Sequence, residues 1–572
     1  MVFRTSLIFP CGAVFVFVFC ALPLFAQPYE SNAGSIQEST HGIVVSASPE
    51  ASAVGAAVLR AGGNAVDAAV ATGFALAVTY PSAGNIGGGC YIVIRMADGR
   101  SAAIDARETA PAAAHRDMYR NDRGEVDTER LLYGPSAAGV PGSVDGLLQA
   151  LETYGTKSRE ELLRPAIAFA RDGFPLHRRL AAGFRIYEND FRRYPSTWRM
   201  FAPEGALPSA GATWTQPDLA AVLRRISDHG RDGFYRGETA RLIDACMRRD
   251  GGYITEEDLA GYHCITRRPV QGKYRHFDIL SMPPSSSGGI TLLQMLGMIE
   301  RGPVPRRPDS SGAFAHYLIE TMRRAYADRA VYLGDPDFAD IPVDRLCSAQ
   351  YLDSLAAGID PRRATPSHLL HGDAFSPREG RNTTHYSIVD RHGNAVSVTT
   401  TINSTYGSKY AVPGGGFLLN NEMDDFSAAP GTPNQFGLLG SEANSIQPGK
   451  RMLSSMTPTI VLEHDTVRLV LGSPGGSRII TTVLQVLLNV LEFRMPLDMA
   501  IARPRFHHQW YPETVGAEDG AFTRATRDHL ESAGHVIIRE VVFGRVDAIY
   551  RTDTGGLQGC SDPRGFGAAV AE

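Results

Sequence analysis

Hydrophobic and polar positions along the 572-residue chain predict a mixture of helices and strands. Two Ala- and Val-rich runs, 51–61 and 65–78, predict a buried helical pair, because Gly62-Gly63-Asn64 between them is typical of a helix end followed by a helix start. The β-prone runs that we assign to strands are 91–96, 101–106, 384–391, 395–401, 417–420, 459–463 and 467–471. The chain is too long for one small domain, and a single large layered α/β unit is compatible with this pattern.

The two β-prone runs on either side of His392-Gly393 predict a β-hairpin. A two-residue turn there would place Thr401 opposite Thr384, and a change of one residue in loop length shifts this register by one position. A second threonine hydroxyl is therefore expected beside Thr383.

Thr383 is the candidate nucleophile of this hairpin. A threonine hydroxyl reacts poorly unless a base lies beside it, and the α-amine of an N-terminal threonine, with an ordinary pKa of about 7.7 to 8.0, is one such base. The hypothesis requires cleavage of the Asn382–Thr383 bond. Residues 366–382 are turn formers and charged residues without a sustained period, which predicts an exposed segment that can move away. On this pattern alone, the alternative is an ordinary hairpin rich in β-formers.

Gly475 and Gly476 lie between the strand that ends at residue 471 and a helix predicted over 479–491. Consecutive glycines at a helix N-terminus present backbone N–H groups to an anion or to a developing oxyanion. A phosphate-binding loop is the competing interpretation, but its lysine is missing.

Three charged residues are candidates for binding a substrate with charges of both signs. Arg107 follows a strand end, where a guanidinium can hold a carboxylate, although most arginines form surface ion pairs. Glu422 and Asp425 are three residues apart and would converge on one ammonium group if the backbone turns there. The alternative for this pair is a solvated acidic turn.

Three other polar stretches have simpler structural interpretations. The serine-rich segment 283–289 is expected to cap a helix over 290–300. The carboxylates within 335–340 are expected in a turn, so we assign no metal site and no cofactor. The long loop 430–450, which carries Phe436, is of the kind that closes over a site.

Charge and composition favour a small-molecule substrate. The formal net charge is −5, from 56 Lys and Arg against 61 Asp and Glu, without basic blocks. These features argue against a nucleic-acid partner or an anionic membrane surface.

Residues 1–26 predict a secretory signal, with an early arginine, an apolar run and a plausible cut after Ala26. No later run approaches the roughly 20 apolar residues that span a bilayer, so we expect a soluble exported protein, periplasmic or secreted.

Five of the seven cysteines remain after removal of residues 1–26, and their spacings match no zinc pattern. Cys246 and Cys264 could pair in an oxidising compartment, while buried free thiols are the alternative.

Four stretches, in this order, resemble the γ-glutamyltransferase family (γ-glutamyl transpeptidases) of the N-terminal-nucleophile hydrolases. They are Thr383-Thr384-His385-Tyr386-Ser387, Leu419-Asn420-Asn421-Glu422-Met423-Asp424-Asp425-Phe426-Ser427, Leu453-Ser454-Ser455-Met456 and Gly472-Ser473-Pro474-Gly475-Gly476-Ser477-Arg478. The resemblance runs from about Gly42 to Arg564. It implies an α/β fold, specifically a four-layer αββα sandwich, in a precursor that cuts itself between Asn382 and Thr383. A large subunit, 27–382, and a small subunit, 383–572, would form one interlocked heterodimer.

The same resemblance implies roles for the residues named above. Thr383 would be the nucleophile, Thr401 would orient it and assist maturation, and the N–H groups of Gly475 and Gly476 would form the oxyanion hole. The residues implied to hold the substrate α-carboxylate are Arg107, Ser454 and Ser455, and those implied to hold its α-amine are Asn403, Glu422 and Asp425.

The activity implied by the resemblance is that of a glutathione hydrolase and γ-glutamyltransferase. A γ-glutamyl ester on Thr383 would pass to water, or to an amino acid or peptide acceptor. Phe436 stands where many bacterial relatives carry tyrosine, which leaves the balance between transfer and hydrolysis open. The alternatives are a cephalosporin (glutaryl) acylase of the same family and an exported γ-glutamyl-binding protein that never cuts itself.

Overall fold

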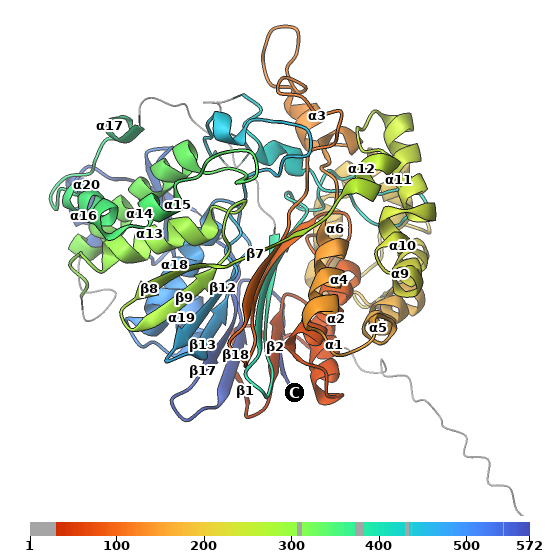
Figure 1. The fold of residues 1–572 in the computed structure, drawn as a ribbon, viewed down its shortest axis with the longest axis horizontal. Coiled ribbons are helices and arrows are strands. Elements are labelled where there is room, and N and C mark those ends of the chain that lie inside the picture. Colours follow the sequence, from red (N-terminus) through yellow and green to blue (C-terminus); the bar gives the residue numbers. More distant parts are fainter. Residues whose placement is uncertain (1–29, 306–311, 372–382, 430–433, 436, 541–542) are drawn as a thin grey trace, which may run out of the picture.

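The computed structural model describes residues 30–305, 312–371, 383–429, 434, 435, 437–540 and 543–572. In Figure 1, two β-sheets lie face to face at the centre, and a layer of helices covers the outer face of each. The four-layer αββα sandwich expected from the sequence is confirmed. A sheet buries both faces in this arrangement, which explains why so many of the strands are hydrophobic along their whole length.

The sheet that carries the candidate nucleophile has seven strands. In spatial order they are β19 (Ala568–Ala571), β2 (Ile43–Ser46), β10 (Thr383–Val389), β11 (Ala395–Thr401), β3 (Gly89–Arg95), β4 (Ser101–Ala106) and β7 (Ile265–Arg267). Neighbouring strands are antiparallel. The β10–β11 hairpin is central, because β2 and β3 flank it.

The second sheet also has seven antiparallel strands. In spatial order they are β1 (Gln37–Ser39), β18 (Leu557–Ser561), β17 (Asp547–Arg551), β13 (Thr466–Leu471), β12 (Thr459–Glu463), β9 (Phe277–Ser281) and β8 (Val270–Tyr274). Each sheet combines strands from before and after residue 383, so neither part of the chain forms a sheet alone. Two small sheets pair β5 (Phe174–Pro175) with β6 (Thr213–Trp214), and β14 (Phe506–His507) with β15 (Thr514–Ala517) and β16 (Val536–Arg539).

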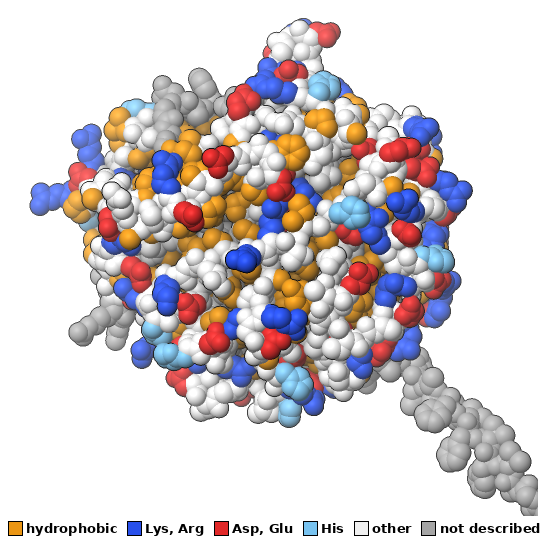
Figure 2. All heavy atoms as spheres, viewed as in Figure 1, with side chains coloured by type: hydrophobic (Ala, Val, Ile, Leu, Met, Phe, Trp, Pro, Cys, Tyr) orange, Lys and Arg blue, Asp and Glu red, His pale blue; other side chains and the backbone are white. Residues whose placement is uncertain are grey.

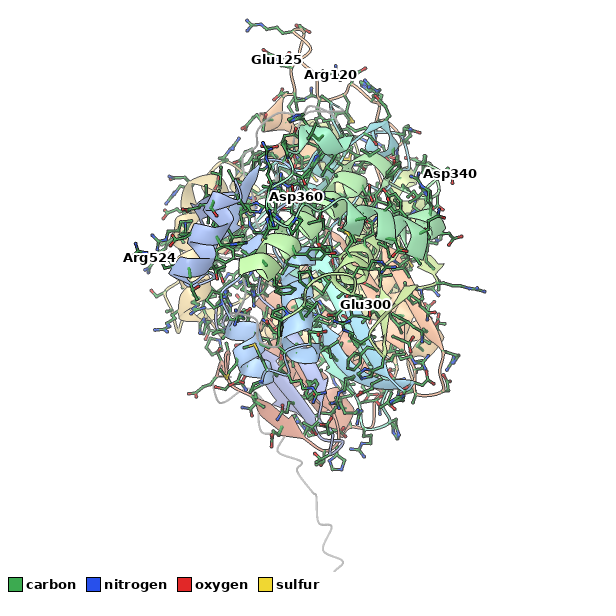
Figure 3. All side chains as sticks on the ribbon, turned by 90° about the vertical axis from the view of Figure 1, so that its left-hand side faces the viewer. Arg120, Glu125, Glu300, Asp340, Asp360 and Arg524 are labelled. Carbon is green, nitrogen blue, oxygen red and sulfur yellow. The ribbon has the colours of Figure 1, made fainter. Side chains whose placement is uncertain are left out.

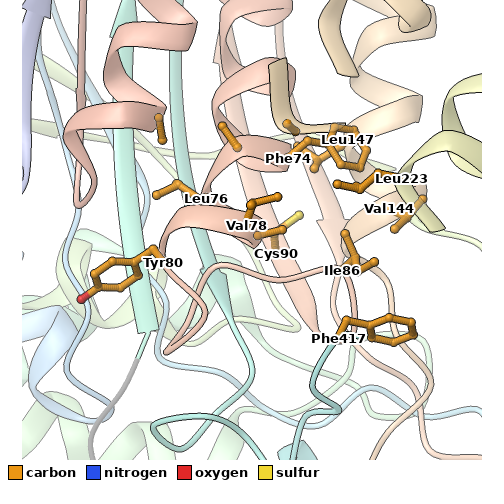
Figure 4. Packing of buried hydrophobic residues seen from close by; sticks show 14 of the residues in the cluster. Phe74, Leu76, Val78, Tyr80, Ile86, Cys90, Val144, Leu147, Leu223 and Phe417 are labelled. Carbon is orange, nitrogen blue, oxygen red and sulfur yellow. The ribbon is translucent and has the colours of Figure 1, made fainter. Parts of the chain in front are cut away.

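One helical layer covers the sheet of β10. Its helices are α1 (Pro49–Arg60), α2 (Ala65–Thr79), α4 (Ser143–Tyr154), α5 (Arg159–Asp172), α6 (Arg178–Ile186), α7 (Glu188–Arg192), α8 (Pro195–Phe201), α9 (Pro217–His229), α10 (Asp232–Tyr235), α11 (Gly237–Asp250) and α12 (Glu256–Gly261). Helix α2 is buried along its whole length, because small Ala and Gly residues let it pack closely against the sheet. Figure 4 shows part of this core, to which α2 contributes Phe74 and α4 contributes Leu147.

The other helical layer covers the second sheet. Its main helices are α13 (Gly288–Ile299), α14 (Gly312–Tyr332), α16 (Ala349–Ala357), α18 (Arg478–Leu491) and α19 (Leu497–Ala502). The remaining short helices are α3 (Thr128–Leu132), α15 (Val343–Leu346), α17 (His368–His371) and α20 (Arg524–Ser532). A separate apolar cluster, which includes Val45, Tyr91 and Ile460, fills the space between the two sheets.

Most predicted elements are present, with small differences at their ends. The helical pair is α1 and α2, and Asn64 caps α2 by accepting hydrogen bonds from the amides of Val66 and Asp67. The strand predicted over 417–420 is wrong, because this segment forms only an isolated bridge between Leu418 and Ala411.

The serine-rich segment meets the start of α13 through Ser286, whose hydroxyl accepts a hydrogen bond from the amide of Gly288 (3.1 Å). Ser287 precedes α13 but makes no side-chain cap hydrogen bond. Its hydroxyl donates to the carbonyl of Ser454 (2.7 Å), and the Ser286 hydroxyl donates to the carbonyl of Met456 (2.6 Å). These serines therefore hold a neighbouring loop as well as the start of the helix.

Charged residues of both signs are interspersed over the face of the molecule shown in Figure 2. The loop that carries Arg120 and Glu125 projects from the body of the fold, as Figure 3 shows. Of the helices in the described ranges, none has the length and apolar character needed to cross a bilayer.

The structure gives the state of five cysteines. Cys90, Cys246, Cys264, Cys347 and Cys560 are all free thiols, so the possible Cys246–Cys264 disulfide is absent from the structure.

Candidate active site

Thr383 is the first residue of β10 and pairs directly with Thr401, at the end of β11. The two-residue turn considered from the sequence is wrong by one residue. Asp390 pairs with Asn394, and its carboxylate accepts hydrogen bonds from the amides of His392 (2.9 Å) and Asn394 (3.0 Å). This three-residue loop shifts the register by one, so Thr401 lies opposite Thr383 and not Thr384.

A small pocket opens beside Thr383, where strand ends and loops of both sheets meet. It is lined by Arg107, Arg329, Thr383, Thr401, Asn403, Glu422, Asp425, Leu438, Ser454, Ser455, Met456, Gly476 and Ile479. Every substrate-binding residue expected from the sequence is among them, and so are both threonines and one of the two glycines. The Thr383 residue is only 5% exposed, so a reacting group there would be shielded from bulk water.

Arg107 is the central charge of the pocket, at the end of β4, and it is completely buried. Its guanidinium lies 2.7 Å from a carboxylate oxygen of Glu422 and 2.5 Å from one of Asp425. These acidic residues form a 3₁₀ turn, Glu422–Asp425, which brings both carboxylates to one side. Glu108 adds a third carboxylate, 3.4 Å from the same guanidinium. Glu422 and Asp425 do converge, but on the Arg107 guanidinium, and their binding of an ammonium group stays a prediction.

Burial raises the pKa values of these carboxyl groups. The pKa of Glu108 rises to about 7, and those of Glu422 and Asp425 also rise, because desolvation outweighs the attraction of Arg107. Repulsion among neighbouring carboxylates contributes in the same direction for Glu108 and Glu422. Three acidic groups thus surround Arg107, and an incoming ammonium group would favour their ionised forms.

Two loops complete the polar wall of the pocket. Asn403 has a positive φ of 68°, and its amide donates to the Thr401 hydroxyl (2.8 Å), while its side chain donates to the carbonyl of Asn421 (2.9 Å). The Ser454–Ser455 segment lies on the other side and is held by the serines that precede α13.

The glycine loop connects β13 to α18 next to Thr383. Gly475 and Gly476 have φ values of 136° and 57°, a backbone shape that favours glycine. In the part of the chain that the structure describes, neither glycine donates its N–H to an acceptor. Gly476 lines the pocket, whereas Gly475 lies beside it, against Gly544. An oxyanion formed at Thr383 would therefore have free donors at hand.

Sequence reasoning missed Arg329, which reaches the pocket from α14. Three arginines of this helix are buried, Arg323, Arg324 and Arg329, and the periodicity of the helix does not distinguish the one that faces the pocket. Asn382 and Phe436 lie outside the described residues. Within the described ranges, no group of three His, Cys, Asp or Glu side chains has an arrangement that could hold a metal ion.

Comparisons with known proteins agree with this geometry. Residues 51–572 match the model of the family described as gamma-glutamyltranspeptidase. The chain is 44% identical over 524 residues to a glutathione hydrolase proenzyme of Escherichia coli (strain K12), which covers 91% of this chain and 90% of the relative.

Two solved structures are similar as well. A cephalosporin acylase from Bacillus halodurans superposes with a TM-score of 0.83 at 27% identity, over 96% of this chain and 98% of the other. A gamma-glutamyltranspeptidase from Helicobacter pylori superposes with a TM-score of 0.58 at 41% identity, over 59% of this chain and 97% of the other.

Proposed function

The chain belongs to the γ-glutamyltranspeptidase family, and from this premise we propose that it is a self-cleaving glutathione hydrolase and γ-glutamyltransferase. The observation that supports this most directly is the position of Thr383. It begins a central strand, lies opposite Thr401, and shares a pocket with Arg107, Glu422 and Gly476.

Maturation would begin with attack of the Thr383 hydroxyl on the carbonyl carbon of Asn382. The acyl group moves from nitrogen to oxygen, and water then hydrolyses the ester. The cut leaves 27–382 as the large subunit and 383–572 as the small subunit. Since both sheets contain strands from both pieces, the two subunits would stay together as one heterodimer.

A γ-glutamyl donor fits the distribution of charge in the pocket. Its α-carboxylate would be held by Arg107, Ser454 and Ser455, and its α-amine by Asn403, Glu422 and Asp425. The ammonium group would add a positive charge to the acidic surroundings of Arg107, whose carboxyl groups have raised pKa values. The glutamyl group would thus be anchored by its α-carbon end, with the γ-carbonyl next to Thr383.

Catalysis would use the α-amine that cleavage creates. The amine takes the hydroxyl proton as the Thr383 oxygen bonds to the γ-carbon, and the developing oxyanion accepts hydrogen bonds from the Gly475 and Gly476 amides. Losing one such donor typically costs about 3 kcal/mol of activation free energy. Collapse breaks the amide bond, and the leaving amine takes a proton. Water releases glutamate from the ester, and an amino acid or peptide amine instead gives a new γ-glutamyl compound.

We further propose export to the periplasm or the exterior after removal of residues 1–26. Glutathione and other γ-glutamyl compounds are the donors that fit a pocket with charges of both signs. The cephalosporin acylase is the second candidate, because a structure of that name superposes over nearly the whole chain.

A single comparison of donors tests the assignment. Glutaryl-p-nitroanilide differs from γ-glutamyl-p-nitroanilide only by lacking the α-amine. We expect purified protein to give two bands on a denaturing gel and to release nitroaniline faster from the γ-glutamyl compound. Faster cleavage of the glutaryl compound would identify an acylase. One intact band without release from either compound would identify a binding protein.

A further inference from the structure

Arg329 has a different environment from the other buried arginines of its helix. Arg323 and Arg324 both pair with the carboxylate of Glu320, at 3.1 and 2.6 Å. Arg329 lies one to two turns further along α14, is 4% exposed and lines the pocket of Thr383. No carboxylate of the described chain lies within 4.0 Å of its guanidinium nitrogens.

The partners of this guanidinium are two hydroxyl groups. Its Nε donates to the Ser287 hydroxyl (2.9 Å), and its Nη2 donates to the Ser455 hydroxyl (3.1 Å). Burial lowers the pKa of Arg329 to about 10, so the group still carries its charge at neutral pH. Asp425 attracts this guanidinium from beyond 4.0 Å, but no carboxylate of the described residues pairs with it directly. A buried cation without a direct ion pair is costly in the free protein, and a bound anion would reduce that cost.

Ser455 connects this charge to the substrate position. Its hydroxyl oxygen accepts from Arg329, and its hydroxyl proton has no acceptor in the described residues. The hydroxyl group can therefore donate into the pocket that it lines. Arg107 cannot match a new anion alone, because Glu422 and Asp425 already share its charge.

We infer that Arg329 is a positioning and specificity-determining residue, which supplies the positive charge for the donor's α-carboxylate by polarising and orienting the Ser455 hydroxyl. The inference rests on the proposed function, since it concerns the same donor. Arg107 would then hold the carboxylate directly while it also pairs with Glu422 and Asp425, and Arg329 would add the further positive charge through Ser455. The Ser287 hydroxyl, which accepts from Nε, helps to hold the guanidinium in place.

The test uses two donors that differ only at the α-carboxyl group, γ-glutamyl-p-nitroanilide and its α-carboxamide. For Arg329→Gln we expect KM for the carboxylate donor to rise about 10- to 100-fold with a smaller change in kcat, as for loss of a charge-assisted hydrogen bond. For the carboxamide, the ratio of variant to wild-type kcat/KM should stay within about threefold. Arg329→Lys, which keeps the charge, should recover part of the loss.

Controls separate this role from a structural one. Arg324→Gln removes a neighbouring buried guanidinium of the same helix, so it should affect both donors equally. Adding Ser455→Ala to Arg329→Gln should cause little further loss, because the two act as one unit. Maturation of each variant is checked first, by the presence of both fragments on a denaturing gel. If Arg329→Gln does not mature, Arg329→Lys takes its place in the comparison of the two donors. Equal losses on both donors, or no loss, would overturn the inference, whereas a wild-type protein inactive on both would refute the proposed function instead.

Discussion

The imidazole ring of His385 packs against the backbone of Gly472. A Cβ atom added to Gly472 would lie 2.3 Å from the His385 Nδ1, closer than side-chain carbons approach other atoms. The histidine is fixed in turn, because its ring nitrogens lie 3.0 Å from the hydroxyls of Thr399 and Ser387. His385 follows Thr383 by two residues on β10, and Gly472 opens the loop that carries Gly475. This contact therefore sets the distance between the nucleophile strand and the candidate oxyanion donors.

We expect Gly472→Ala to lower both stability and activity. The new methyl group must displace His385 or the loop, and overpacking of this kind typically costs about 1–3 kcal/mol. Thermal unfolding gives the loss of stability, and kcat on γ-glutamyl-p-nitroanilide gives the loss of activity. Gly261→Ala is the matched control, because no atom lies within 4 Å of its added Cβ. A Gly472→Ala protein with wild-type kcat would show that this contact does not position the loop.

Replacement of Thr383 tests the proposed cleavage. We expect Thr383→Ala to give one uncut, inactive chain, because both the attacking hydroxyl and the later nucleophile are lost. Thr384→Ser is the control, since successive residues on a strand point to opposite faces and Thr384 should not reach the pocket. Denaturing gels show the cut, and N-terminal sequencing of the smaller fragment should begin at Thr383. A cut and active Thr383→Ala protein would remove this residue from its role.

The sequence predicts much of this architecture because the relevant signals are local. The threonine-rich hairpin, the glycine pair before α18 and the acidic turn after Asn421 each depend on residues that are close in the chain. The exact register of β10 against β11 was not predictable, because it depends on the Asp390 carboxylate accepting two loop amides. Loop length alone does not reveal such a bond.

Other features depend on contacts between distant segments. The serines before α13 hold the loop at Ser454, and nothing in their own segment indicates that partner. Arg329 similarly reaches Ser455, which is 126 residues away in the sequence. Helical periodicity identifies a buried face, but it does not show which buried arginine reaches the pocket without a direct ion pair.

Neutralising Asp425 should weaken recognition of the donor's amine. We expect Asp425→Asn to lower kcat/KM for γ-glutamyl-p-nitroanilide by about 10- to 100-fold, because a charge-assisted hydrogen bond to the ammonium group is lost. Glutaryl-p-nitroanilide, which has no α-amine, should be affected much less. Kinetics on the two donors with the wild type and the variant give the comparison. An equal loss on both donors would place Asp425 in the support of Arg107 and not in binding of the amine.

Several buried histidines should make stability depend on pH. Burial lowers the pKa values of His385 and His507 to about 3 and that of His535 to about 4. The unfolded chain binds these protons near the ordinary value of about 6.5, so between the folded and unfolded pKa values it holds more protons than the native state. The stabilising contribution of each neutral histidine is therefore complete above pH 6.5 and is lost as the pH falls. Carboxyl groups with raised pKa values, such as Glu108, act in the opposite direction, so the test needs a difference between variants.

His507→Gln isolates one of these contributions. The ring nitrogens of His507 lie 2.8 Å from the Thr481 hydroxyl and 2.8 Å from the Gln509 side-chain oxygen, and glutamine preserves polar groups at that position. Urea unfolding of the uncut Thr383→Ala chain between pH 5 and pH 6.5 gives the free energy of unfolding without dissociation of subunits. Over this range we expect His507→Gln to reduce the fall in stability on acidification by up to about 1.4 kcal/mol per pH unit. The exposed His392→Gln should leave the slope unchanged, and an unchanged slope in His507→Gln as well would mean that His507 does not stay neutral in the folded protein.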